Sequence, residues 1–228
     1  MSDEIRRHGF LSARGTVGHA VYLIIRLFTR TVMRWYLRVR VIGEENLNVD
    51  PPVILAPVHR SNLDAPLVGG IPDWQPRALS KESLFGNPIL AWIITALGSF
   101  PVRREAADRE AMKTAEGLLR AGEPLLVFPE GTRQSGREVG EVFDGTAYMA
   151  MRTGSPVIPV GVAGTDLSMP SGARFPRRSR VTVVIGEALT PPATTGRVRR
   201  REVKAFTAEL SGALQRVQDL AWAEVDSR

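Results

Sequence analysis

Two polar residues in the first third of the chain have types that could move a proton. His59 and Asp64 follow the apolar stretch 53–57. On a regular helix, side chains five positions apart point about 140° away from each other. If His59 lies in a loop and Ser61 or Asn62 caps a new helix, Asp64 falls in the first turn of that helix and its carboxylate can reach back to the imidazole. A carboxylate so placed would fix the imidazole tautomer and stabilise the imidazolium, which predicts a general base. The alternative is that Asp64 only caps a helix.

A second polar segment, 128–133, follows the apolar stretch 125–128. Gly131 would let the backbone approach a ligand closely, and Arg133 has the planar fork that suits phosphate oxygens. Glu130 could orient that arginine or accept a hydrogen bond from a substrate hydroxyl. The simpler alternative is a tight turn with a local Glu–Arg pair.

Three further cations are candidates for binding a phosphate. Arg103 and Arg104 are adjacent on an extended segment, so they point to opposite faces and one of them can enter a site. Lys81 follows a predicted strand at 77–80. A solvated lysine is the alternative for that position.

The N-terminal stretch 16–41 is rich in apolar residues and contains no Asp or Glu. Each arginine at the centre of a membrane span costs about 2.5–3.5 kcal/mol, so a simple span is unfavourable. Arg26, Arg30, Arg34 and Arg38 recur every fourth residue and would share one face of a helix. The pattern predicts an amphipathic helix lying in a membrane surface. A helix that covers a soluble core has the same period and remains the alternative.

Composition limits the classes of function. The 228 residues carry a net charge of +6 and contain no cysteine, which excludes disulfides, thiolate metal ligands and a cysteine nucleophile. The three histidines lack metal-site spacing, so we predict no metal centre. A basic chain favours an anionic partner. No nucleic-acid-binding motif is present, so a basic nucleic-acid or membrane module without enzymatic activity is a distant alternative.

Strand and helix patterns alternate along the rest of the chain. Strands are predicted at 39–42, 53–57, 77–80, 100–102, 125–128, 157–162 and 181–185. Helices are predicted at 88–97, 108–120, 146–153 and 203–221. This order predicts a single α/β domain at 39–228, with a mixed, largely parallel sheet flanked by helices. It would follow an N-terminal membrane-associating segment at 1–38.

Taken together, these segments resemble the glycerophospholipid acyltransferase family, and most closely the 1-acylglycerol-3-phosphate acyltransferases. His59 and Asp64 match the motif His-x-x-x-x-Asp, and 128–133 matches Phe-Pro-Glu-Gly-Thr-Arg at every position. The segment 98–104 resembles Gly-x-Ile-x-x-x-Arg, with Phe100 in place of the aliphatic residue. The segment 157–160 matches a Val-Ile-Pro-Val strand.

The resemblance implies direct acyl transfer from acyl-CoA or acyl carrier protein, used as a co-substrate, with no cofactor. His59 would deprotonate a hydroxyl of a lysophosphatidic-acid-like acceptor at the cytoplasmic face of the cell membrane, where the protein would be peripheral or monotopic. Acceptor-binding residues would be Lys81, Arg103, Arg104, Glu130, Gly131, Thr132 and Arg133. Glycerol 3-phosphate, another lysophospholipid or a glycolipid are alternative acceptors. One departure is Asp144, because many relatives carry a basic residue there.

Two further segments remain open at this stage. The apolar segment 89–97 would line an acyl-chain channel or form a plain core helix. The arginine cluster at 174–180 would meet lipid or coenzyme A phosphates, or form a solvated surface.

Overall fold

The computed structural model describes residues 16–102, 109–193 and 197–228, in which seven strands form one sheet. The strands are β1 (Arg40–Ile42), β2 (Ile54–Pro57), β3 (Arg77–Lys81), β4 (Ser99–Val102), β5 (Leu125–Leu126), β6 (Val157–Ala163) and β7 (Thr182–Ile185). Their order across the sheet is β1-β7-β6-β2-β5-β3-β4. Neighbouring strands are parallel except for β6 and β7. The predicted α/β domain with a mixed, largely parallel sheet is confirmed.

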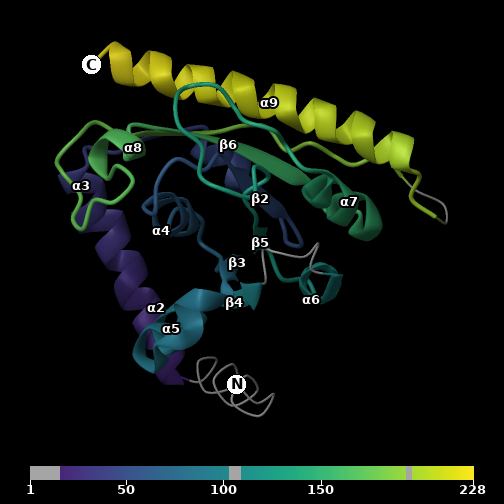
Figure 1. Cartoon of the computed structure of the whole chain (residues 1–228), viewed down its shortest axis with the longest axis horizontal. Coiled ribbons are helices and arrows are strands. Elements are labelled where there is room, and N and C mark those ends of the chain that lie inside the picture. Colours follow the sequence, from purple (N-terminus) through teal and green to yellow (C-terminus); the bar gives the residue numbers. More distant parts are fainter. Residues whose placement is uncertain (1–15, 103–108, 194–196) are drawn as a thin grey trace.

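Helices cover both faces of this sheet (Figure 1). They are α2 (Thr16–Phe28), α3 (Arg34–Tyr36), α4 (Asp64–Gly69), α5 (Pro88–Ala96), α6 (Arg109–Arg120), α7 (Asp144–Thr153), α8 (Thr165–Ser168) and α9 (Arg200–Asp226). α6, α7 and α9 pack on one side, and α2, α4 and α5 lie on the other. β2 and β6 are buried along their whole lengths, as expected for strands covered on both faces.

Three adjacent strands gather polar residues at one edge of the sheet. β6, β2 and β5 are neighbours and run parallel, so their carboxyl ends lie at the same edge. His59 follows β2, the segment 128–133 follows β5, and α8 follows β6. In open α/β sheets, ligand sites form at this edge.

Arg26 and Arg30 share one side of the N-terminal helix, as predicted, but that side faces the protein, where both guanidinium groups reach Asp73. α2 passes through a π-helical turn (Thr29–Met33) into α3, and the wider turn breaks the four-residue spacing. Arg26 donates to the carbonyl oxygen of Pro72, and Arg30 donates to the carbonyl oxygens of residues 70 and 71. Arg38 lies beyond the end of the helix. Two of the four arginines therefore bind the protein itself.

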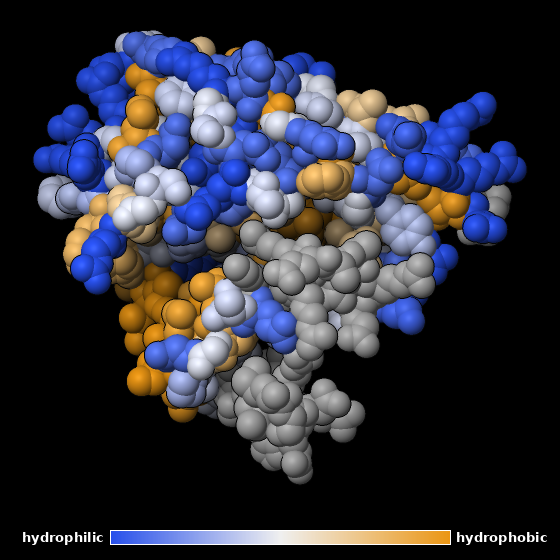
Figure 2. All heavy atoms as spheres, viewed as in Figure 1, coloured by the Kyte–Doolittle hydropathy of each residue, from blue (hydrophilic) through white to orange (hydrophobic). Residues whose placement is uncertain are grey.

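The exposed side of this helix is apolar, and α5 extends it. The exposed residues are Val17, Leu23, Ile24, Leu27 and Phe28 of α2, together with Leu84, Ile89 and Leu90 at and before α5. We call these residues the α2–α5 patch, and Figure 2 shows apolar atoms gathered where these two helices lie. An exposed apolar area of this kind marks an interaction surface. Within the part of the chain that the structure describes, no helix has the length and hydropathy needed to cross a membrane.

Candidate active site

The structure brings His59 and Asp64 together at the carboxyl end of β2. The imidazole Nδ1 lies 3.1 Å from Asp64 Oδ2. The backbone amides of Arg60 and Ser61 also donate to Oδ2, both at 2.6 Å, and the Thr165 hydroxyl donates to Oδ1 at 2.7 Å. The Asp64 side chain is fully buried. Because an ionised carboxylate only accepts hydrogen bonds, His59 Nδ1 must carry the proton, and Nε2 keeps the lone pair that can take a proton from a substrate.

The start of α4 differs from the prediction in one respect. The helix begins at Asp64, but its N-cap is Leu63 and no side chain caps it. The Ser61 hydroxyl instead donates to the carbonyl oxygen of Met169 at 3.0 Å. The predicted capping by Ser61 or Asn62 is therefore wrong, because the Asp64 carboxylate itself satisfies the amides of the preceding loop.

A buried ion pair supports the backbone of His59. Arg60 Nη1 lies 3.0 and 2.9 Å from the two carboxylate oxygens of Glu130, and both side chains are fully buried. Glu130 also accepts from the backbone amides of His59 at 2.7 Å and Gly140 at 2.8 Å. The predicted pairing of Glu130 with Arg133 is therefore wrong. The carboxylate faces Arg60, and it positions the histidine backbone.

The turn after β5 exposes Thr132 and Arg133 to solvent. Gly131 adopts a φ of 66°, which a residue with a side chain rarely does, and its amide donates to the carbonyl oxygen of Phe128 at 3.0 Å. The tight turn that was the simpler alternative for this segment is therefore present, without the local Glu–Arg pair. Arg133 lines the same cavity as His59.

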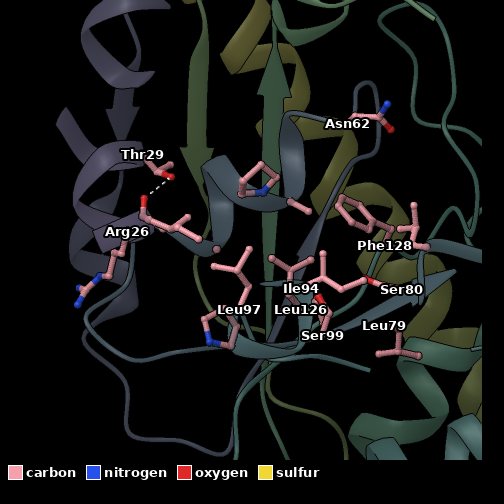
Figure 3. Close-up of a pocket in the computed structure, with 18 of the residues that line it drawn as sticks. Arg26, Thr29, Asn62, Leu79, Ser80, Ile94, Leu97, Ser99, Leu126 and Phe128 are labelled. Atoms are coloured by element: carbon pink, nitrogen blue, oxygen red, sulfur yellow. Dashed lines mark hydrogen bonds between the residues drawn. The ribbon is translucent and has the colours of Figure 1, made fainter. Parts of the chain in front are cut away.

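A cavity of about 620 Å³ lies beside His59 and is lined by α2, α4, α5 and β3. The Phe128 ring stacks on the imidazole, with 3.9 Å between the ring centroids. Figure 3 shows Ile94, Leu97 and Leu126 close together in this cavity, with Phe128 to one side of them. The volume falls in the range typical of small-molecule sites, and the grouping of aliphatic side chains suits an apolar ligand.

On the α2 side of the cavity, neither Arg26 nor Tyr22 presents a charged group to such a ligand. The Arg26 guanidinium points away from the aliphatic cluster (Figure 3) and binds Pro72 and Asp73. Burial raises the pKa of the Tyr22 phenol, so this side chain is neutral at ordinary pH. The Tyr22 hydroxyl is buried and has no hydrogen-bond partner among the described residues.

Comparison with known proteins places this geometry in a family. A family model described as Acyltransferase matches residues 38–163, more than half of the chain. The chain belongs to this acyltransferase family.

Several relatives carry the same printed name, 1-acyl-sn-glycerol-3-phosphate acyltransferase. The Bacillus subtilis protein is 28% identical over 80% of this chain and 87% of its own length. The Pseudomonas aeruginosa protein is 30% identical over 79% of this chain and 73% of its own length. A Chlamydomonas reinhardtii protein is 32% identical over 68% of this chain, but the match covers only 48% of that protein. This chain thus spans about half the length of some curated relatives that it matches.

A solved structure shares the fold. The crystal structure of the 1-acyl-sn-glycerophosphate (LPA) acyltransferase PlsC from Thermotoga maritima has a TM-score of 0.72 and 28% sequence identity. The match covers 95% of this chain and 86% of that one.

Not every acyltransferase motif residue falls in the described part of the chain. Arg103 and Arg104 lie outside the described residues, as does the side chain of Lys81, although Lys81 itself ends β3. Asp144, which departs from the family pattern, begins α7 and accepts from the Thr207 hydroxyl of α9 at 2.9 Å. This acid therefore holds two helices together.

Two residues that hold the site, Thr165 and Arg60, were not among those predicted from the sequence. Thr165 could have been found by its position, since it follows the end of β6, next to β2. Arg60 could not, because nothing in the sequence distinguishes a buried arginine beside the histidine from an exposed one.

Proposed function

We propose that this chain transfers a fatty acyl group from acyl-CoA or acyl carrier protein to a hydroxyl of a lysophosphatidic-acid-like acceptor, giving phosphatidic acid. The observation that carries the proposal is the His59–Asp64 pair beside the cavity. The Acyltransferase family match and the printed names of the relatives support the same reaction.

The chemistry follows from the geometry of His59. Nε2 takes the proton of the acceptor hydroxyl while the oxygen attacks the thioester carbonyl carbon. Asp64 stabilises the imidazolium that forms, because its carboxylate accepts the Nδ1–H hydrogen bond. The carbon–sulfur bond then breaks, and the imidazolium returns its proton to the leaving thiolate. An ester and a free thiol result, and no acyl-enzyme is formed.

The two ends of the substrate have different surroundings. An acyl chain fits the aliphatic part of the cavity, around Ile94, Leu97 and Leu126. The acceptor phosphate would meet Arg133, which lines the cavity from its exposed position. Arg104, Arg103 and Lys81 remain proposed partners for this phosphate.

The protein would work as a peripheral enzyme on the cytoplasmic face of the cell membrane. The α2–α5 patch is exposed and apolar, and it lies on two helices that also line the cavity. Burial of this patch in the lipid interface would bring a lipid acceptor to His59 without a membrane span.

The decisive experiment offers the enzyme several acceptors with one acyl thioester, and identifies the products by mass spectrometry. We expect phosphatidic acid from lysophosphatidic acid, and no product from the His59→Ala variant, which should remain folded. Product formed only from glycerol 3-phosphate, another lysophospholipid or a glycolipid would correct the acceptor. Reaction only with a phosphate-free acceptor would overturn the role of Arg133, and full turnover by His59→Ala would overturn the proposed base.

A further inference from the structure

A second exposed apolar site lies where the loop after α8 meets α3. The Phe175 side chain is 82% exposed and Trp35 is 70% exposed. The Tyr36 hydroxyl donates to the carbonyl oxygen of Pro176 at 3.2 Å, and the Arg178 guanidinium lies over the Trp35 ring, 5.6 Å from its centroid. We call Trp35, Phe175 and Arg178 the Trp35–Phe175 site. Figure 1 shows this loop beside α3.

The loop is closed at its base, which fixes the direction in which its tip projects. The Arg177 amide donates to the carbonyl oxygen of Ser168 at 2.7 Å, and the Ser168 hydroxyl donates to the carbonyl oxygen of Arg177 at 2.7 Å. Within the tip, the Ala173 amide donates to the carbonyl oxygen of Pro170 at 3.0 Å. Phe175 therefore lies on a structured projection. A phenylalanine side chain is ordinarily buried, so its exposure here is unusual.

The charge around the tip indicates what covers it. Arg174, Arg177, Arg178 and Arg180 are all exposed, and no acidic residue occurs in 167–186. Arginines with aromatic and aliphatic side chains between them match the interface of an anionic bilayer. Lipid phosphates bind the cations there, and aromatic rings lie at head-group depth.

The site also continues a surface that is already apolar. Ile24, Leu27, Val32 and Trp35 are exposed along one continuous helical segment, from α2 through the π-helical turn to α3. The α2–α5 patch lies towards one end of that segment and the Trp35–Phe175 site lies at the other.

We propose that the Trp35–Phe175 site is a second membrane anchor, which inserts Phe175 into the interface of an anionic bilayer while the neighbouring arginines bind lipid phosphates. The anchor is tied to the candidate active site, because Met169 at the start of the same loop accepts a hydrogen bond from Ser61. Two contacts with the bilayer, one at each end of the helix, would fix the orientation of the cavity relative to the lipid. The proposal concerns lipid binding and does not depend on the acyl transfer reaction.

The test is co-sedimentation of the full chain with vesicles of equal parts phosphatidylcholine and phosphatidylglycerol. Phe175→Ser should lower the partition coefficient about tenfold, since a phenylalanine leaves the interface. Arg178→Gln should lower it about fivefold and make it less sensitive to salt. Leu220→Ser and Arg201→Gln on α9 remove an exposed apolar side chain and an exposed guanidinium group far from the loop in sequence, and should leave partitioning unchanged.

A measurement that needs no change to the loop provides a second check. Bromine-labelled lipids should quench tryptophan fluorescence of the unaltered chain, and Trp35→Phe should remove part of that quenching. Partition coefficients and quenching that stay the same in all three variants would overturn the anchor.

An assay with a short-chain, water-soluble lysophosphatidic acid and no vesicles distinguishes an effect on acyl transfer from an effect on membrane binding. Phe175→Ser should match the unaltered chain there, and a loss of turnover would show that the residue serves the reaction and not the membrane. If Phe175→Ser and Arg178→Gln bind vesicles as the unaltered chain does but have a raised KM for acyl carrier protein, the surface docks an acidic protein. The membrane proposal would then be wrong.

Discussion

Asp64 accepts hydrogen bonds from four donors, and only one of them is the imidazole. Two backbone amides from the loop and the Thr165 hydroxyl supply the others. An asparagine would turn an NH2 group or a single oxygen toward these donors, and at least one donor would lose its acceptor. The residue therefore fixes both the loop and the ring.

We predict that Asp64→Asn lowers kcat about 10²–10⁴-fold with little change in KM, because the base loses its fixed tautomer and the stabilisation of its charged form. Steady-state kinetics with an acyl thioester measure this, and thermal unfolding confirms that the variant folds. Asp50→Asn makes the same change at an exposed position and should keep full activity. Unaltered kcat in Asp64→Asn would contradict the assignment.

Thr165 acts through Asp64 and is a positioning residue. We predict that Thr165→Val lowers kcat about tenfold and leaves KM unchanged, since a hydrogen bond to a charged group is lost without any contact with substrate. Thr165→Ser keeps the hydroxyl and should restore most of kcat. If the serine variant is as slow as the valine variant, packing by the threonine methyl is responsible.

At this scale, the sequence predicted the meeting of His59 and Asp64 but not the partner of Glu130. The meeting of His59 and Asp64 could be predicted because it depends only on local geometry, a loop that leads into the start of a helix. The partner of Glu130 depends on which arginine enters the interior. Glu130 pairs with Arg60 and not with Arg133 because of tertiary packing between β2 and β5. His59 and Glu130, which are joined by a hydrogen bond, are 71 residues apart in sequence.

Among the elements, α2 and the π-helical turn are tied to the 70–73 loop by two arginine side chains. Arg30 donates to two backbone carbonyl oxygens of the 70–73 loop, and Arg26 donates to one. Hydrogen bonds from Arg26 and then Arg30 hold the pKa of the Asp73 carboxyl below its ordinary value of 3.8. Ionised Asp73 therefore stabilises the folded chain at any pH above the pKa that this carboxyl has in the unfolded chain. The stabilisation is lost as the pH falls through the lower pKa of the folded chain. Asp73 is highly exposed, so its contribution to the free energy of unfolding is small.

We predict that Arg30→Gln speeds amide hydrogen exchange in α2 and the π-helical turn about tenfold or more, because charged donors to buried carbonyl groups are lost. Exchange followed by mass spectrometry resolves this segment from the rest of the chain. Asp73→Asn leaves the carbonyl contacts in place and should have a much smaller effect. Equal exchange in Arg30→Gln and the unaltered chain would mean that apolar packing alone holds the helix.

Elements marked by an apolar run or a helical period were predictable, including short strands. The strands β2, β3, β6 and β7 and the helices α6 and α9 lie within a few residues of their predicted bounds, since apolar runs and helical periods mark them. α8 has four residues, too few to show a period, and it went unpredicted. The π-helical turn has no sequence signature comparable to a cap, so the sequence did not predict the change of helical period between Arg30 and Arg34.

Over the whole molecule, α9 approaches the sheet closely at a glycine of β6. A Cβ at Gly161 of β6 would lie 2.3 Å from the carbonyl oxygen of Val217 and 2.8 Å from the amide nitrogen of Gln218. The Gln218 side chain also bonds the amide and the carbonyl of Val162, at 2.9 and 3.1 Å. Any side chain at Gly161 must therefore push α9 away from the sheet.

We predict that Gly161→Ala lowers the free energy of unfolding by about 1–3 kcal/mol or more, as overpacking against backbone atoms does. Urea denaturation measures the change. Gly117→Ala on α6 is the matched control, because a Cβ there meets nothing within 4 Å. That variant should gain about 0.5–1 kcal/mol from helix propensity. An equal effect of both changes would refute the close approach.

The hydrogen bond from the His59 amide to Glu130 closes the chain between these residues into one long loop. That loop contains β3, α5 and β4, and it contributes Leu79, Ile94 and Leu97 to the cavity wall. His59 closes this loop, and Asp64 lies five residues into it, before β3 begins. A chimera that grafts only 77–102, from β3 to β4, from a relative should thus exchange fatty-acid preference while it keeps the recipient's His59–Asp64 pair and reaction chemistry.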